Sequence, residues 1–331
     1  MNDPGQQEVL VIKHGALGDM VLATGPFGAI RAHHARAHIT LLTTSAYAEM
    51  MQGSGWFDEI WIDSKPTLWQ PGDWLRLRRM LRGGNFARVY DLQHSDRTHM
   101  YYRLLGRPRP EWSGIAKGAS HPHTNPDRDS MHTIERQAEQ LAQAGIAKTP
   151  PTDISFLAAD LTRLRLGDRY ALLVPGGARH RPRKRWPAGR YAALAGWLAN
   201  RDVRPVLIGT LEEQDVLDEI ADRVPATLNL CQYTTFAEIA ELARHAIAAV
   251  GNDTGPMHLI AAAGCPTVVL FSAESVPAQT APRGEAVTIL EAKTLETMAV
   301  ARVLVALKDF DPAFSREAKP GETLGESPET G

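Results

Sequence analysis

Three short segments combine glycines with charged or polar side chains in patterns that suit group transfer. The first, residues 14–19 (His-Gly-Ala-Leu-Gly-Asp), leaves a short apolar run at residues 9–12. Its two glycines, Gly15 and Gly18, permit a tight backbone, and Asp19 falls at the start of the next apolar segment. A carboxylate there is a candidate general base. It is also a common helix N-cap, which requires no catalytic role.

The second segment is a basic loop that follows the apolar run 170–174 and has a proline and two glycines at its start. Five lysine and arginine side chains fall within residues 179–185, among them Lys184 and Arg185. Paired lysine and arginine contacts are a common way to bind a diphosphate. The alternative is a solvated basic loop that holds no ligand.

The third segment, residues 250–258, ends an apolar run and opens a helix that has Pro256 in its first turn. Backbone N–H groups at a helix start bind anions without a metal. Simple capping by an aspartate or threonine is the alternative, and a lone histidine is more often packed than a ligand. The candidate donor-binding residues here are Asp253, Thr254, Gly255 and His258.

Other polar residues give weaker signals. Glu212 follows an apolar run and suits a ribose hydroxyl, with Glu213 one residue away, but an acidic first helical turn explains both. The Asp127-Arg-Asp129 spacing resembles the metal-binding DxD of other transferases, yet it lies in a His/Pro-rich stretch. Cysteine and histidine spacings match no zinc motif. We therefore expect neither a metal nor a cofactor.

Composition places these segments in a globular protein. The chain has 331 residues, 44% hydrophobic and 22% charged, with a formal net charge of −2. This length predicts about two domains, and the charge gives no general attraction to nucleic acid. The amino terminus is polar, unlike a signal peptide. No apolar run reaches the roughly 18 residues that cross a bilayer, so we expect a cytoplasmic protein.

Strands and helices alternate along the chain, which predicts an α/β fold with parallel sheets. The expected strands are residues 9–12, 38–43, 59–62, 88–93, 170–174, 204–209, 228–231, 246–250 and 267–271. The expected helices are residues 20–33, 73–82, 130–144, 188–200, 211–223, 235–245, 256–263 and 294–308. The pattern restarts near residue 168, so we expect two doubly wound units whose ligands bind at the carboxyl ends of the strands.

This pattern divides the chain into four parts. We expect an acceptor-binding domain at 1–155, a nucleotide-sugar domain at 168–293, a closing helix at 294–310 and a disordered tail at 311–331. Two facing domains would form one cleft for a two-substrate reaction. Helix 73–82 carries Trp74, Leu77 and Leu81 on one side among four arginines. We favour a core-facing stripe with arginines that reach solvent over an interfacial membrane helix.

The chain resembles the bacterial lipopolysaccharide heptosyltransferases of glycosyltransferase family nine over all but the tail. Residues 15–19 look like its GxLGD signature, and Asp91-Leu-Gln93 resembles its DLQ element. Lys184-Arg-Trp-Pro187 resembles its KxWP loop, and residues 251–258 resemble its most specific motif. The resemblance implies a GT-B fold: two Rossmann-like domains facing a central cleft.

The resemblance also implies a function and site roles. It implies inverting, metal-independent transfer of a heptose from ADP-heptose to an inner-core acceptor, with Asp19 as base and Lys184 at the leaving diphosphate. Substrate contacts would come from Gly15, Gly18, Gln93, Arg185, Glu212, Asp253, Thr254, Gly255 and His258. A lipid-linked acceptor would bring the protein to the cytoplasmic face of the inner membrane as a peripheral partner. A nucleotide-sugar 2-epimerase and a non-catalytic nucleotide-sugar binding protein remain alternatives.

Overall fold

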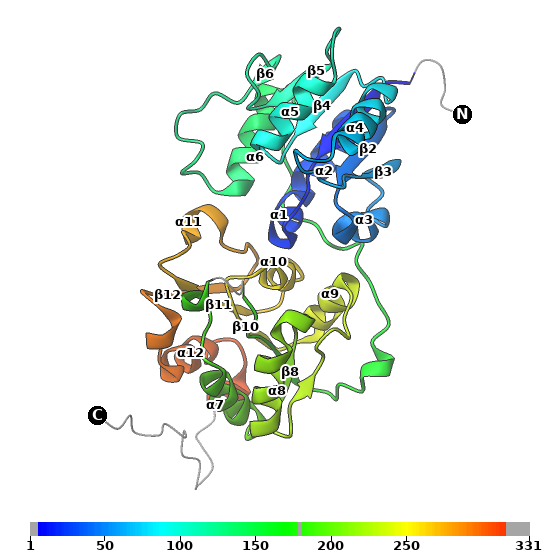
Figure 1. The fold of residues 1–331 in the computed structure, drawn as a ribbon. Helices are drawn as coiled ribbons and strands as arrows, with labels where there is room; N and C mark the ends of the chain where they lie inside the picture. Colours follow the sequence, from blue (N-terminus) through cyan, green and yellow to red (C-terminus); the bar gives the residue numbers. More distant parts are fainter. Residues whose placement is uncertain (1–5, 178–180, 316–331) are drawn as a thin grey trace. The chain divides into compact units, whose positions relative to one another are not determined.

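The computed structural model describes residues 6–177 and 181–315, and the chain divides into two compact units, Met1–Phe156 and Leu157–Gly331. Each unit is a parallel sheet with helices packed against it (Figure 1). Among the described residues, no helix is both long and apolar enough to cross a membrane.

The first unit contains a six-stranded sheet in the order β3-β2-β1-β4-β5-β6. Its strands are β1 (Glu8–Ile12), β2 (His38–Thr43), β3 (Glu59–Ile62), β4 (Arg88–Asp91), β5 (Glu111–Gly114) and β6 (His121–Pro122). Its helices are α1 (Leu17–Leu22), α2 (Thr24–His33), α3 (Ser45–Gln52), α4 (Pro71–Gly83), α5 (Asp96–Leu104) and α6 (Thr133–Gln143). Helices α4 and α5 contact each other and share one core cluster with β1, whereas α6 contacts α1 and α2.

The second unit repeats this strand order, β12-β11-β10-β7-β8-β9. Its strands are β7 (Tyr170–Val174), β8 (Arg204–Leu207), β9 (Leu228–Asn229), β10 (Ala248–Asn252), β11 (Thr267–Ser272) and β12 (Val287–Ala292). Its α-helices are α7 (Ala188–Ala199), α8 (Gln214–Arg223), α9 (Phe236–His245), α10 (Gly255–Ala262), α11 (Pro277–Thr280) and α12 (Val300–Leu307). Its 3₁₀ turns are η1 (Thr162–Leu164), η2 (Pro182–Lys184), η3 (Leu211–Glu213), η4 (Leu295–Thr297) and η5 (Pro312–Ser315).

The strand order explains where a ligand would bind. In both sheets the chain starts at a central strand, builds outward to one edge and then crosses back beside that first strand. The reversal falls between β1 and β4 in one unit and between β7 and β10 in the other. Ligands of such sheets bind at this switch point, beyond the carboxyl ends of the strands. The predicted α/β class with two Rossmann-like sheets is confirmed.

Several predicted elements have different bounds. The helix expected at 20–33 is two helices, α1 and α2, that meet at Ala23. Pro26 lies in the first turn of α2, where its missing N–H costs nothing, so a new helix begins just before it. The strand expected at 88–93 ends at Asp91, because Asp91 accepts backbone N–H bonds from the two residues that follow Leu92.

The carboxyl-terminal prediction is also partly wrong. The helix expected at 294–308 is the turn η4 followed by α12, which packs on α7. The tail expected to be disordered from residue 311 begins with η5, where Phe314 is buried against Trp197. Residues 316–331 of that tail lie outside the described residues. The prediction missed β5, β6 and β12, which are short or half-exposed strands near the sheet edges.

The face of α4 is as predicted. Leu77 and Leu81 are buried, and Trp74 packs beside them with its ring 6.2 Å from that of Tyr101. The arginines of this helix at 76, 78, 79 and 82 are exposed. The helix therefore points its apolar stripe at the core of the first unit.

Candidate active site

The loop after β1 holds Asp19 at the switch point of the first unit. Gly15 has φ +107°, and a Cβ there would clash with the ring of Tyr47, so this position favours glycine. Gly18 is buried within α1. Asp19 occupies the third position of this helix, and its Oδ2 accepts from the Ala16 N–H at 3.3 Å. Its side chain stays 43% exposed, so the carboxylate remains accessible after capping the helix.

Lys13 is the buried ion-pair partner of Asp19. Its side chain is buried, its Nζ donates to the Leu92 carbonyl at 3.1 Å, and the same Nζ lies 3.5 Å from Asp19 Oδ1. Burial lowers the pKa of Lys13, and the negative charge of Asp19 opposes that shift. Each oxygen of Asp19 thus has one partner from the protein. Lys13 was not predicted as a site residue, although a lysine directly after an apolar strand is a visible signal.

Two further groups lie in the electrostatic field of Asp19. Burial raises the pKa of Tyr47, and the charge of Asp19 adds to the increase. Burial lowers the pKa of Arg136 on α6, Arg128 lowers it further, and Asp19 opposes both effects. Neither Tyr47 nor Arg136 was predicted for the site, because each comes from a segment distant in the chain from Asp19.

Gln93 joins the two loops of this switch point. Its Oε1 accepts from the His14 N–H at 2.8 Å, while its own N–H donates to Asp91 Oδ1 at 3.1 Å. Burial raises the pKa of Asp91, although hydrogen bonds from Thr98 and His94 oppose the rise. The amide oxygen of Gln93 therefore orients the loop that carries Asp19.

The second unit places Lys184 beside Asp253. Lys184 Nζ donates to Asp253 Oδ2 at 2.7 Å, and the Ser275 hydroxyl donates to the same oxygen at 2.6 Å. The two side chains are only 13% and 11% exposed. Asp253 therefore pairs with a lysine instead of capping α10. Two basic-loop residues, Arg179 and His180, lie outside the described residues.

Asn252 connects the loops around this pair. It is fully buried; its Nδ2 donates to the Pro175 and Gly176 carbonyls, and its Oδ1 accepts from the Trp186 N–H and the Tyr191 hydroxyl. These bonds hold the loop after β7 against the loop after β10. Asn252 lies within the third glycine-containing segment of the sequence, but no role was predicted for it.

Arg185 and Glu213 also fix the loop after β7. Arg185 Nε donates to the Gly177 carbonyl at 3.1 Å. The Gly177 N–H donates to Glu213 Oε1 at 3.0 Å, and the Thr210 N–H donates to Glu213 Oε2 at 2.8 Å. Glu213 is thus engaged in the protein, whereas Glu212 is exposed beside it.

The start of α10 adds backbone donors. Thr254 is its N-cap residue but makes no side-chain cap bond, and its hydroxyl donates to the Asn252 carbonyl at 3.2 Å. The helix begins at Gly255, and His258 is buried in its first turns. Without a side-chain cap, the first-turn N–H groups are a suitable anion site. Lys184, Asp253 and this helix end therefore lie together in the second unit, as the motifs predicted.

The described residues offer no arrangement of metal ligands. Within residues 6–177 and 181–315, no group of three His, Cys, Asp or Glu side chains is arranged to hold a metal. Asp129 of the DxD spacing pairs with Arg128 at 2.8 Å.

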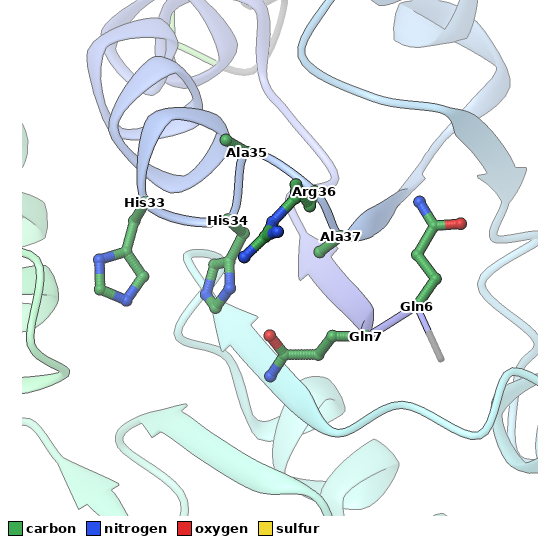
Figure 2. A pocket seen from close by; sticks show the side chains of 7 residues that line it. All are labelled: Gln6, Gln7, His33, His34, Ala35, Arg36 and Ala37. Atoms are coloured by element: carbon green, nitrogen blue, oxygen red, sulfur yellow. The ribbon is translucent and has the colours of Figure 1, made fainter. Parts of the chain in front are cut away.

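A cavity of about 880 Å³ lies between Gln6–Gln7 and residues 33–37, at the amino end of β1 (Figure 2). That end is opposite the switch point, so this cavity contains none of the predicted site residues.

Comparisons of the sequence with known proteins match heptosyltransferases. The sequence profile of glycosyltransferase family 9 (heptosyltransferase) matches residues 74–305. Lipooligosaccharide heptosyltransferase 2 of Haemophilus influenzae is 34% identical over 130 residues, which span 38% of this chain and 37% of that protein. Lipopolysaccharide heptosyltransferase 2 of Salmonella typhimurium is 24% identical over 292 residues, 81% of this chain and 83% of that one. The structure of Escherichia coli ADP-heptose LPS heptosyltransferase II shares the fold, with TM-score 0.74 and 22% identity over 92% of this chain and 98% of that chain.

Proposed function

Because the chain belongs to glycosyltransferase family 9 (heptosyltransferase), we propose that it transfers a heptose from ADP-heptose to an acceptor of the lipopolysaccharide inner core. Its relatives include lipopolysaccharide heptosyltransferase 2, and the ADP-heptose LPS heptosyltransferase II of Escherichia coli shares its fold, which supports this choice of substrates. The family favours a transferase over the 2-epimerase and the non-catalytic binding protein.

The acceptor is activated by Asp19. An acceptor hydroxyl has a pKa far above neutral, so its proton must leave as the new bond forms. Asp19 is suited to take it, because its carboxylate is accessible at the switch point while Lys13 and the Ala16 N–H hold it in place. This accessible but anchored carboxylate is the observation that carries the proposal.

The donor is bound by the second unit. The acceptor oxygen attacks the anomeric carbon from the face opposite the nucleotide, and the bond to the diphosphate breaks, which inverts the anomeric centre. Negative charge grows on the leaving diphosphate, and Lys184, with the backbone N–H groups that begin α10, stabilises it without a metal. Gln93 and Gly18 shape the acceptor side, and Arg185, Thr254 and His258 shape the donor side.

Glu212 is the ribose ligand in this proposal. Both oxygens of Glu213 already accept hydrogen bonds from Gly177 and Thr210, so that carboxylate maintains the loop. The neighbouring Glu212 is exposed on the same turn after β8. A carboxylate accepting from a ribose hydroxyl would then select for the nucleoside of the donor.

The reaction requires the acceptor hydroxyl to reach the anomeric carbon of the donor. The acceptor in this proposal is lipid-linked. We expect the protein to act at the cytoplasmic face of the membrane that holds this acceptor. Assays with acceptors that end in Kdo, in a first heptose or in a more distant core sugar identify the acceptor.

The function is tested by incubating the protein with ADP-heptose and inner-core acceptors, with and without a chelator. We expect heptosylated acceptor with inverted anomeric configuration by NMR, at the same rate in chelator. ADP-heptose without acceptor separates the alternatives: an epimerase would alter the donor alone. Calorimetry with UDP- and GDP-sugars is the control for the nucleotide. Retained configuration, or transfer only from another nucleotide, would overturn the proposal.

A further inference from the structure

The turn before α4 exposes two large apolar side chains. Leu68 is 77% exposed and Trp69 is 92% exposed, and Leu75 on α4 is 51% exposed. Single exposed apolar residues are normal on a soluble protein. Here three exposed apolar side chains fall within eight residues, and one of them is a tryptophan that is almost entirely in solvent. Such a concentrated apolar surface indicates a binding partner.

The turn is built to hold these side chains outward. The Gln70 N–H donates to the Thr67 carbonyl at 3.1 Å, and the Thr67 N–H donates to Gln70 Oε1 at 2.7 Å, so Leu68 and Trp69 occupy the tip. Trp74 Nε1 donates to the same Thr67 carbonyl at 2.9 Å and ties the turn to the helix. The exposure of the tip is therefore a property of a bonded turn.

The turn is also fastened to the body of the unit. Arg97 on α5 donates from Nη1 to the Pro66 carbonyl at 3.0 Å, and its guanidinium lies 5.6 Å from the centre of the Trp74 ring. Trp74 itself packs toward the core. These contacts fix which side of the segment faces solvent.

The same surface is strongly basic. Between residues 64 and 85 the sequence has five basic residues and one acidic residue, Asp73. One face of α4 carries Leu75, Arg79 and Arg82, which are spaced four and three residues apart. This face is turned away from the buried Leu77 and Leu81. The exposed basic residues are Lys65, Arg76, Arg78, Arg79 and Arg82.

We propose that Leu68, Trp69 and the exposed basic face of α4 form a membrane contact surface that binds an anionic phospholipid bilayer. Tryptophan is favoured at the boundary between headgroups and acyl chains, and clustered lysine and arginine side chains are attracted to anionic headgroups. A short apolar tip beside a basic face has the chemistry of an interfacial contact. An acidic protein would satisfy the arginines but gives no reason for an exposed Leu-Trp tip.

The test is sedimentation of the full chain with phosphatidylcholine vesicles that contain or lack phosphatidylglycerol, without sugar substrates. We expect binding to the anionic vesicles, weakened by salt, and little binding to neutral ones. L68S/W69S and R76E/R79E should each reduce the fraction bound about tenfold or more at equal lipid. The matched controls are Y233S/V305S, which removes exposed apolar side chains from the second unit, and R36E/R302E, which reverses exposed arginines elsewhere.

The controls should bind as the unaltered protein does, and circular dichroism should show all variants folded because the altered side chains are exposed. Asp19→Asn should also bind vesicles normally, so this result is independent of the transferase proposal. Equal binding to neutral vesicles, absence of binding at low salt, or equal loss in the control pairs would overturn the membrane contact.

Discussion

The two units share one strand order but present different chemistry at their switch points. Each has a lysine–aspartate pair there: Lys13 with Asp19 at 3.5 Å, and Lys184 with Asp253 at 2.7 Å. In the first unit the lysine is buried and the aspartate is 43% exposed, whereas both members are mostly covered in the second. The same fold thus presents an accessible carboxylate in one unit and a closed ion pair in the other.

The loops around each pair explain the difference. In the first unit the side-chain amide of Gln93 binds the loop that carries Asp19, and the Asp19 carboxylate stays accessible. In the second unit Asn252 draws two loops together, and Asp253 accepts from both Lys184 and Ser275. The first arrangement suits proton transfer, and the second suits cations and backbone donors fixed around an anion.

Among substitutions at these two pairs, the largest effect on turnover is expected from Lys13→Met. The change leaves Asp19 without its nearest cation, so turnover should fall on the order of 100-fold, with unchanged affinity for the donor. Steady-state kinetics and donor calorimetry measure turnover and donor affinity. Unchanged turnover, or a donor affinity that falls in step with it, would contradict this role of Lys13.

A smaller effect is expected from Lys184→Ala. Donor affinity should weaken roughly 30-fold, since a charge-assisted contact to the diphosphate is lost. The free energy of unfolding should fall by about 2 kcal/mol, because Asp253 is left mostly buried without its cation. Calorimetry and urea unfolding report the two effects.

The double variant K184A/D253A is the control for stability. It should recover part of the lost free energy of unfolding while donor binding stays weak. Donor affinity equal to that of the unaltered protein in either variant would contradict the assignment of Lys184.

The smallest effects are expected at two adjacent carboxylates, Glu212 and Glu213, to which different roles are assigned. Glu212→Gln should weaken ADP-heptose binding about tenfold through the ribose, with no change in Tm. Glu213→Gln should instead lower the free energy of unfolding by about 1 kcal/mol, because its carboxylate accepts from Gly177 and Thr210. Calorimetry and thermal melts of the two variants compare directly. The reverse pattern would exchange their roles.

The sequence predicted those parts of the fold that depend on local pattern. Buried runs such as residues 9–12 and 170–174 are strands, and the glycine-rich segments follow them at the switch points. Edge strands such as β6 and β12 were missed, because a short or half-exposed strand lacks a continuous apolar run. The break at Ala23 was also missed, since apolar residues continue across it.

The site was predictable where one motif contains it. Gln93 bonds to the loop that carries Asp19, and Lys184 pairs with Asp253, because each pair of motifs follows neighbouring strands. Arg136 and Ser275 could not be predicted, since their approach depends on how α6 and the loop after β11 pack. The engagement of Glu213 likewise depends on the conformation of Gly177 and on no sequence spacing.

The division of labour between the units is tested most directly by Asp19→Asn, with turnover and donor affinity measured on one preparation. The variant should lose 100-fold or more of kcat, since an amide cannot take the acceptor proton. Its calorimetric Kd for ADP-heptose should equal that of the unaltered protein, because the donor is assigned to the second unit. Normal turnover, or a donor affinity that falls in step with the rate, would contradict the account.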